Sequence, residues 1–275
     1  MVKIYGKHTL SVEQSEVLSV SNRATECLAD EDPSSILNIP FVKEEILLAL
    51  AQTTNTAYNP EEDIHPLMLK NGGENLQDLI LSIANAALKT NKFPSQCKFD
   101  HKIPIPKLFK DNYHTYKAYR PITLESIVGK TITRMIRNRV EWFLESRNCY
   151  SSTQEAYRKD HNCNDLVLRA VQHIQEEWNR GETTVMCIFD FSSYFECIWR
   201  EKLVCKLHEA GIKGDMLRLM ADYLTERKFR LVVNQYTTGK TDFYFTIYYF
   251  SCFLELFSSS SSCLLPHMYL HFVVA

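Results

Sequence analysis

The chain has 275 residues, of which 45% are hydrophobic and 23% are charged, the composition of an ordinary globular protein. These values exclude a mainly disordered chain, a collagen-like chain and a membrane protein with many spans. The formal net charge is only −2, but residues 98–140 hold 10 Lys and Arg against 3 Asp and Glu, a net charge of +7. A local basic block inside a near-neutral chain indicates an anionic partner better than the total charge does.

The first hundred residues predict helices that follow a weakly patterned start. Residues 1–40 are polar, and we expect a weakly structured lead-in there. Apolar residues at helical spacing then predict helices over 40–51, 64–69 and 76–88. The stretch HKIPIPK, residues 101–107, is too rich in proline for a central strand, so we expect an extended loop or an edge strand.

The clearest helix is predicted over residues 126–147, where apolar side chains repeat every three to four positions. They are Val128, Ile132, Met135, Ile136, Val140 and Phe143. Lys130, Arg134 and Arg137 share another face of this helix at the same spacing. Such a basic stripe is either an ordinary solvated helix face or a surface that follows a phosphate backbone, with an affinity that falls as salt rises.

The second half of the chain alternates helices with strands. A helix is predicted to begin near Asn164 and to end at Gly181. Its buried side is predicted to carry Val167, Val171, Ile174 and Trp178. The run TTVMCIFDF over residues 183–191 is apolar on both faces, which predicts a buried central strand. Helices over 200–210 and 215–226 and a strand over 229–235 follow. This alternation predicts a mixed α/β (α+β) domain.

The last 33 residues, 243–275, differ from the rest of the chain. They hold 10 of the 32 aromatic residues and no Lys or Arg. A membrane span needs about 20 mostly apolar residues, and the serine run 258–262 and Pro266 interrupt that length. We therefore expect no span, and we interpret this segment as a tail foreign to the fold.

The cysteines and the N-terminal sequence indicate the cellular compartment of the protein. The nine cysteines include no C-x-x-C pair, so a zinc ribbon is not indicated, and the N-terminus lacks the apolar core of a signal peptide. We therefore expect an intracellular protein, cytoplasmic or nuclear and not secreted, with reduced thiols.

Asp190 is the candidate that the residues alone single out. A carboxylate that ends a buried strand lies where α/β sheets often place their active groups, and Mg²⁺ prefers carboxylate oxygens together with substrate phosphates. Taken alone, the ordinary interpretation is better, namely an Asp that ends a strand or caps a helix. The neighbourhood changes this balance, because Asp190 is followed by Phe191, two serines, two aromatic residues and Glu196.

Several sequence blocks resemble the reverse transcriptase domain of non-LTR (LINE-type, jockey-like) retrotransposons. The segment FDFSSYFECIWREKLVCKLHEAGIKG (189–214) resembles the first palm motif, and IPIPKLFKD (103–111) with YKAYRPITL (116–124) resembles the finger motif. Similar blocks are SIVGKTITRMIRNRV (126–140), SSTQEAYRKDHNCNDL (151–166) and RKFRLVVN (227–234). The resemblance covers about residues 97–240. Group II intron maturases and telomerases fit less well, because the W-R-x-x-L-x-x-K-L run favours the non-LTR type.

The resemblance implies a right-hand polymerase fold. It implies fingers over 41–188 and a partial palm over 189–242, between the lead-in 1–40 and the tail 243–275. Partners implied in this way are an RNA template, a DNA primer and a deoxynucleoside triphosphate. The chemistry implied is nucleotidyl transfer, in which Mg²⁺ ions stabilise the attacking and leaving oxygens.

The same resemblance assigns roles to single residues. Asp190 is implied to be the catalytic and metal-binding carboxylate, with the carbonyl of Phe191 as a further Mg²⁺ ligand. Phe195 matches the ring that excludes a 2′-hydroxyl. Lys107, Arg120 and Gln154 match nucleotide-binding positions, and Arg158 together with the basic stripe is implied to contact nucleic acid. An ordinary surface charge is the alternative for each basic residue.

The sequence departs from the family in its second half. The strings G-x-P-Q-G and A-D-D, of which the second carries the other palm carboxylate in the family, do not occur in this sequence. We therefore expect a domain truncated before the second catalytic palm motif, an incomplete palm sheet and no polymerase activity from this chain alone. Two alternatives stay open, a non-catalytic remnant that binds RNA or other nucleic acid and a translated pseudogene fragment.

Overall fold

The structure is a computed structural model that describes residues 14–54, 64–115, 118–187, 198–233, 236–237, 241–242 and 271–274. Its helices are α1 (Gln14–Ala29), α2 (Lys43–Ala51), α3 (Pro66–Asn71), α4 (Gly73–Thr90), α5 (Ile127–Ser146), α6 (Cys163–Asn179), α7 (Arg200–Glu209) and α8 (Gly214–Tyr223), with short 3₁₀ turns η1 (Ile36–Asn38) and η3 (Ser95–Lys98). Its strands are β1 (Phe99–Pro106), β2 (Tyr119–Leu124), β3 (Thr184–Cys187), β4 (Lys228–Val233), β5 (Tyr236–Thr237), β6 (Thr241–Asp242) and β7 (His271–Val274). The predicted mixed α/β class is confirmed.

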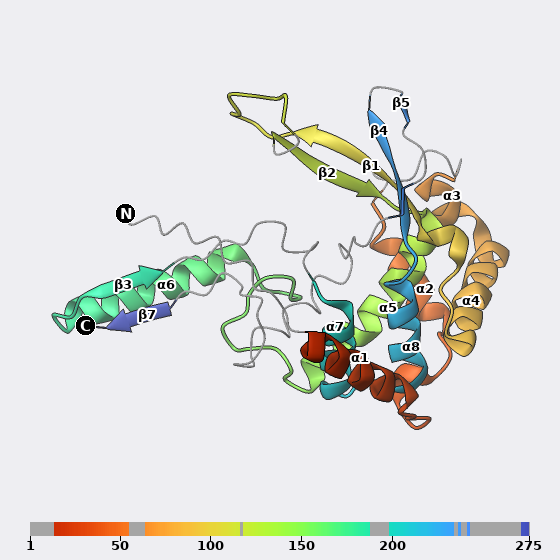
Figure 1. The fold of residues 1–275 in the computed structure, drawn as a ribbon, viewed down its shortest axis with the longest axis horizontal. Helices are drawn as coiled ribbons and strands as arrows, with labels where there is room; N and C mark the ends of the chain where they lie inside the picture. Colours follow the sequence, from red (N-terminus) through yellow and green to blue (C-terminus); the bar gives the residue numbers. More distant parts are fainter. Residues whose placement is uncertain are drawn as a thin grey trace.

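Helix α5 lies at the centre of a helical body formed with α2, α4, α7 and α8 (Figure 1). Its side chains Ile132, Met135 and Ile136 are fully buried, as the sequence predicted. Burial of one such side chain stabilises the fold by about 2 kcal/mol. The helix begins at a side-chain cap, because Ser126 Oγ accepts a hydrogen bond from the Gly129 amide at 3.1 Å. Such a cap satisfies one of the amides that a helix start leaves unpaired.

Gly129 also brings α5 close to the turn that precedes β1. A Cβ atom at this position would lie 2.8 Å from Cys97 Cβ, which is closer than two carbon atoms can approach without a shift. The absence of a side chain therefore lets η3 lie directly on the first turn of α5. This contact positions the start of β1 against the helical body.

Residues 14–29 form a helix, although the sequence predicted a weakly structured lead-in over residues 1–40. Helix α1 packs against α7 and α8, and Glu16 pairs with Lys202 of α7 at 2.9 Å. The apolar signal is weak because α1 buries only small side chains, such as Ala24. Of the described helices, none has the length and apolar character that a membrane crossing requires.

Strand β1 lies inside a small sheet in the order β2-β1-β4-β5, with β6 also paired to β4. β2 runs antiparallel to β1, from His101 opposite Leu124 to Pro106 opposite Tyr119. β4 runs parallel to β1 only along Phe99–Lys102, before the two prolines. Among the described strands, the proline-containing half of β1 is thus paired on one side only, which suits residues without an amide hydrogen. The edge-strand prediction is right for this half and wrong for the first half.

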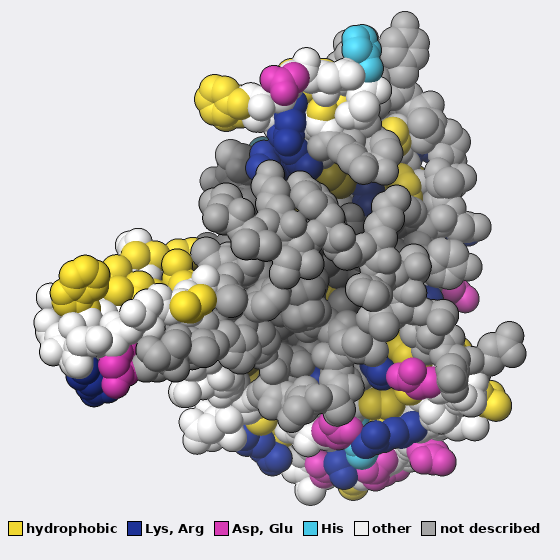
Figure 2. Space-filling model, turned by 60° about the vertical axis from the view of Figure 1, so that its left-hand side comes forward, with side chains coloured by type: hydrophobic (Ala, Val, Ile, Leu, Met, Phe, Trp, Pro, Cys, Tyr) yellow, Lys and Arg dark blue, Asp and Glu magenta, His cyan; other side chains and the backbone are white. Residues whose placement is uncertain are grey.

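Helix α6 forms an arm with β3 and β7 that extends away from the helical body (Figure 1). The helix begins close to the predicted start at Asn164, but its cap is Asn162, whose side chain accepts a hydrogen bond from the Asn164 amide at 2.7 Å. Its apolar side is not buried, however, because Val167, Val171 and Trp178 are 59%, 53% and 79% exposed. Figure 2 shows apolar side chains gathered on this arm. The predicted buried side is therefore wrong, since no described element covers it.

Strand β3 also differs from its prediction as a buried central strand. In the described part of the chain it pairs with β7 alone, from Thr184 opposite Val274 to Cys187 opposite His271. The Val185 side chain of β3 is about half exposed. Residues 188–191, the rest of the predicted strand, lie outside the described residues.

Candidate functional site

Lys107 and Arg120 share one face of the β1–β2 hairpin. Arg120 lies opposite Ile105 in the antiparallel pairing. The pairing continues past the end of β1, because the Lys107 amide donates a hydrogen bond to the Ala118 carbonyl at 2.7 Å. Side chains alternate along a strand, so Lys107, two residues beyond Ile105, faces the same side as Arg120. Diagonal neighbours of this kind lie about 7–8 Å apart, within reach of long side chains. The backbone pairing thus places two of the predicted cations on the same face of the hairpin.

Two tyrosines order the backbone that carries these cations. The hydroxyl of Tyr113 donates to the Lys107 carbonyl at 2.8 Å, and the hydroxyl of Tyr119 donates to the Tyr113 carbonyl at 3.1 Å. The two rings meet edge to face with their centroids 6.2 Å apart. Arg120 itself is exposed, and no carboxylate of the described chain pairs with it. Its guanidinium can therefore bind an anion from solution.

A buried charge cluster holds the base of this hairpin on the helical body. It consists of Asp100 on β1, Glu125 after β2, Tyr223 at the end of α8 and Arg227 before β4. Arg227 Nη2 donates to both carboxylate oxygens of Asp100, at 2.8 and 2.7 Å, and lies 3.5 Å from Glu125 Oε1. The Tyr223 hydroxyl donates to the same Glu125 oxygen at 3.2 Å. The cluster therefore joins both strands of the hairpin to the α8–β4 connection.

Within this cluster two carboxylates share one guanidinium, while Lys130 outside it attracts Glu125 and Lys102 attracts Asp100. Burial raises the pKa of Glu125 to about 7; nearby Arg227 works against this rise, and Asp100 adds to it by repulsion. Burial also raises the pKa of Asp100, against the attraction of Arg227. Glu125 Oε2 and Arg227 Nη1 have no hydrogen-bond partner among the described residues. The second carboxylate is therefore easily protonated.

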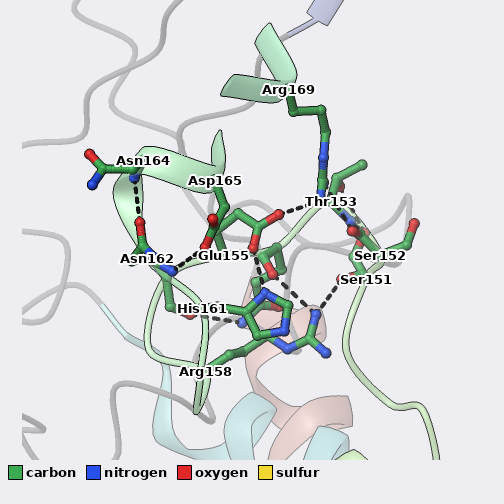
Figure 3. A network of polar contacts seen from close by, with 12 residues as sticks. Ser151, Ser152, Thr153, Glu155, Arg158, His161, Asn162, Asn164, Asp165 and Arg169 are labelled. Carbon is green, nitrogen blue, oxygen red and sulfur yellow. Dashed lines mark hydrogen bonds and ion pairs between the residues drawn. The ribbon is translucent and has the colours of Figure 1, made fainter. Parts of the chain in front are cut away.

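Arg158 lies in a polar loop between α5 and α6 that internal hydrogen bonds hold together (Figure 3). Its Nε and Nη2 donate to the Glu145 carboxylate at 2.9 and 3.0 Å. Its Nη1 donates to the carbonyls of Ser151 and Gln154 at 3.2 and 3.1 Å. All three guanidinium nitrogens are thus engaged inside the protein. The geometry gives no support to the predicted contact between Arg158 and nucleic acid.

Gln154 and Glu155 are two buried residues of the same loop. Gln154 is 9% exposed, and its Nε2 donates to the Ala156 carbonyl at 3.4 Å. Glu155 reaches His161 Nδ1 at 2.5 Å and also pairs with Arg169 of α6, as Figure 3 shows. The loop is therefore tied to both flanking helices, and Gln154 points into it. The predicted contact between Gln154 and a nucleotide stays a prediction.

The expected exposed basic stripe on α5 does not form. Lys130 and Arg134 are 9% and 8% exposed, because this face of α5 packs against α2 and the residues that follow it. Arg134 Nη1 donates to Thr53 Oγ1 at 2.5 Å, and burial lowers the pKa of both basic groups. Arg137 is half-buried and lies 3.6 Å from Glu141. The prediction of a solvent-facing surface is therefore wrong for Lys130 and Arg134.

The predicted catalytic residues Asp190, Phe191 and Phe195 lie outside the described residues. Among the residues that the structure does describe, no group of three or more His, Cys, Asp or Glu could hold a metal ion. Sequence reasoning missed the buried cluster of Asp100, Glu125 and Arg227. The available signal was weak, consisting of single charges at the ends of predicted strands and helices.

Comparison with known proteins identifies relatives for more than half of the chain. The family model described as reverse transcriptase (RNA-dependent DNA polymerase) matches residues 105–246. The probable RNA-directed DNA polymerase from transposon BS of Drosophila melanogaster is 28% identical over 156 residues, which are 56% of this chain and 17% of the relative. The RNA-directed DNA polymerase from mobile element jockey of Drosophila funebris is 22% identical over 240 residues, 78% of this chain and 26% of that relative. The RNA-directed DNA polymerase from mobile element jockey of Drosophila melanogaster is 27% identical over 164 residues, which are 60% of this chain and 18% of that relative. The chain thus spans only about a sixth to a quarter of these relatives.

Proposed function

The chain belongs to the reverse transcriptase (RNA-dependent DNA polymerase) family, and from this premise we propose that its β1–β2 hairpin binds the triphosphate of an incoming deoxynucleotide. The predicted resemblance to jockey-like elements is confirmed by the relatives. The observation that carries the proposal is the common face of Lys107 and Arg120 on the hairpin. A Lys supplies a compact charge for phosphate and an Arg supplies a planar fork that can bind two oxygens.

The proposal assigns polymerase subdomains to the chain. Residues 41–188 would form the fingers and 189–242 part of the palm, acting on an RNA template and a DNA primer. The Asp190 carboxylate and the Phe191 carbonyl are oxygen donors, which suit a hard cation such as Mg²⁺. When bound there, Mg²⁺ would offset phosphate charge during nucleotidyl transfer. Phe195 would lie beside the sugar and exclude a 2′-hydroxyl by its bulk.

Nucleotide binding is the direct test of this proposal. Fluorescence anisotropy of a dye-labelled deoxynucleoside triphosphate, with Mg²⁺ at low salt, should report binding by the intact chain. Lys107→Ala and Arg120→Ala should each lower the affinity about 10-fold or more, since a charge-assisted hydrogen bond contributes about 1.5–3 kcal/mol. Lys89→Ala is the matched control, because Lys89 is exposed at the end of α4. Equal affinities for all four proteins would refute the proposal.

We also propose that this chain alone does not complete the reaction, because the strings that carry the second palm carboxylate do not occur in it. Primer extension on an RNA template with Mg²⁺ should yield no product. If the chain synthesises DNA and Asp190→Ala abolishes that synthesis, the proposal of an incomplete reaction is overturned. The separate proposal of nucleotide binding would still stand. The alternative of a non-catalytic RNA-binding remnant depended on the α5 stripe and on the fingers, and the burial of Lys130 and Arg134 removes the first of these two observations.

A further inference from the structure

Two thiols from distant parts of the sequence meet between α1 and α7. Cys27 lies near the end of α1 and Cys205 in the middle of α7. Both cysteines are free and buried, with 7% and 5% of their surface exposed. Helices α1 and α7 pack against each other, and the Cys27 thiol is close enough to raise the pKa of Cys205. The two thiols therefore lie next to each other in the helix interface.

Ion pairs on both sides of the thiols fix this arrangement. Asp30 and His208 each lie three residues, about one helical turn, beyond the two cysteines, and His208 Nε2 is 2.7 Å from Asp30 Oδ2. Arg23 Nη2 lies 2.5 Å from Glu209 Oε1, and both of these charges act on Cys205. Lys213 Nζ adds a second contact to Asp30 at 2.8 Å. The juxtaposition of the sulfurs is therefore set by the docking of two helices and not by one side chain.

We propose that Cys27 and Cys205 form a disulfide under oxidising conditions, which cross-links α1 to α7. The oxidant would be a low-molecular-weight disulfide. A thiolate of one cysteine attacks a sulfur of that disulfide and releases one thiolate of the small molecule. The second cysteine loses its proton and displaces the other small-molecule thiolate from the mixed disulfide. The protein loses two electrons and two protons, and two small-molecule thiols form.

The surroundings determine how such a site responds. The thiolate is the reactive form, and burial together with the Cys27 thiol raises the pKa of Cys205 to about 11. The charged groups that face the pair are Arg23 and Glu209 on one side and Asp30, His208 and Lys213 on the other. Because both sulfurs are buried, α1 has to lift from α7 before the oxidant can enter. The cross-link therefore forms slowly, and it then prevents α1 from lifting again.

Oxidation of the full chain with glutathione disulfide, followed by peptide mass spectrometry, tests the proposal. We expect a peptide containing Cys27 joined to one containing Cys205, with the pair about 2 Da lighter than the two reduced peptides. Cys163 is exposed, so its mixed disulfide with glutathione shows that the oxidant was active. Other pairings, or a reduced Cys27 and Cys205 in a sample with modified Cys163, would overturn the proposal.

Thermal unfolding gives an independent readout. Oxidation should raise the midpoint of the intact chain by about 5–10 °C, since a cross-link that closes a long loop restricts the unfolded chain. Dithiothreitol should reverse the rise. Cys27→Ala and Cys205→Ala should abolish it, and Cys163→Ala should keep it. A rise that persists in either of the first two variants would exclude this pair as its source.

Discussion

Replacement of Glu125 by Gln should change how the stability of the protein depends on pH. Gln keeps the shape of the side chain and an oxygen that can accept from Tyr223, but it does not titrate. In the wild type the pKa of Glu125 rises from an ordinary 4.5 to about 7 in the folded state. The folded protein therefore binds a proton that the unfolded chain has already released. Stability from this group is complete below pH 4.5 and is lost as the pH rises through about 7.

The size of the effect follows from the two pKa values. Between pH 5 and pH 8 the Glu125 contribution to the free energy of unfolding falls by about 2.5 kcal/mol, because one pKa unit corresponds to about 1.36 kcal/mol. Urea unfolding of the wild type and Glu125→Gln across this range should give two curves that separate as the pH rises. The variant should gain relative stability at pH 8. Titrating groups that do not interact with Glu125 cancel in the difference between the two proteins.

The control for this experiment is Glu74→Gln, because the Glu74 side chain is 82% exposed on α4. Its curve should run parallel to that of the wild type. If the difference between the wild type and Glu125→Gln is constant from pH 5 to pH 8, Glu125 is not a protonated buried acid. The imbalance of charge in the cluster would then be compensated in the folded protein, and the reasoning would fail.

Two further predictions concern single hydrogen-bonding groups. Arg227→Met should lower the free energy of unfolding by about 3–5 kcal/mol, since it removes the guanidinium that bonds the buried Asp100 and lies beside Glu125. Urea unfolding measures this loss, and Arg180→Met, at a side chain 64% exposed, should cost little. Ser126→Ala should cost about 1 kcal/mol through the lost cap of α5, read as a lower thermal midpoint, and an unchanged midpoint would show that the cap does not stabilise α5.

Helix positions could be predicted from the sequence because they depend on local spacing. The apolar repeat over 126–147 fixed both the extent of α5 and its buried face, and Gly181 marks the end of α6 as predicted, whereas the cap of α6 is Asn162, two residues before the predicted start. The resemblance also identified Lys107 and Arg120, which the structure then brought onto one face. In each case the relevant residues lie within one element or one hairpin.

Whether another element buries a given face of a helix could not be predicted in the same way. The spacing of Val167, Val171 and Trp178 shows that one side of α6 is apolar, but burial depends on another element that packs on it. The opposite error occurred on α5, where Lys130 and Arg134 looked solvated and are buried. Long basic side chains can lie along a packed surface while their polar ends find partners. Such contacts join residues far apart in sequence, as Arg134 and Thr53 do.

The buried cluster links the stability of the fold to the geometry of the proposed nucleotide site. Arg227 holds Asp100 on β1 and Glu125 after β2, and the proposed phosphate contacts lie at the other end of the same two strands. A variant at Arg227 would therefore displace Lys107 and Arg120 together, without a contact of its own to nucleotide. Weak nucleotide binding by such a variant identifies Arg227 as a positioning residue only if the variant is folded and still carries Lys107 and Arg120. The stability measured for Arg227→Met is thus needed before any loss of binding is assigned to the site.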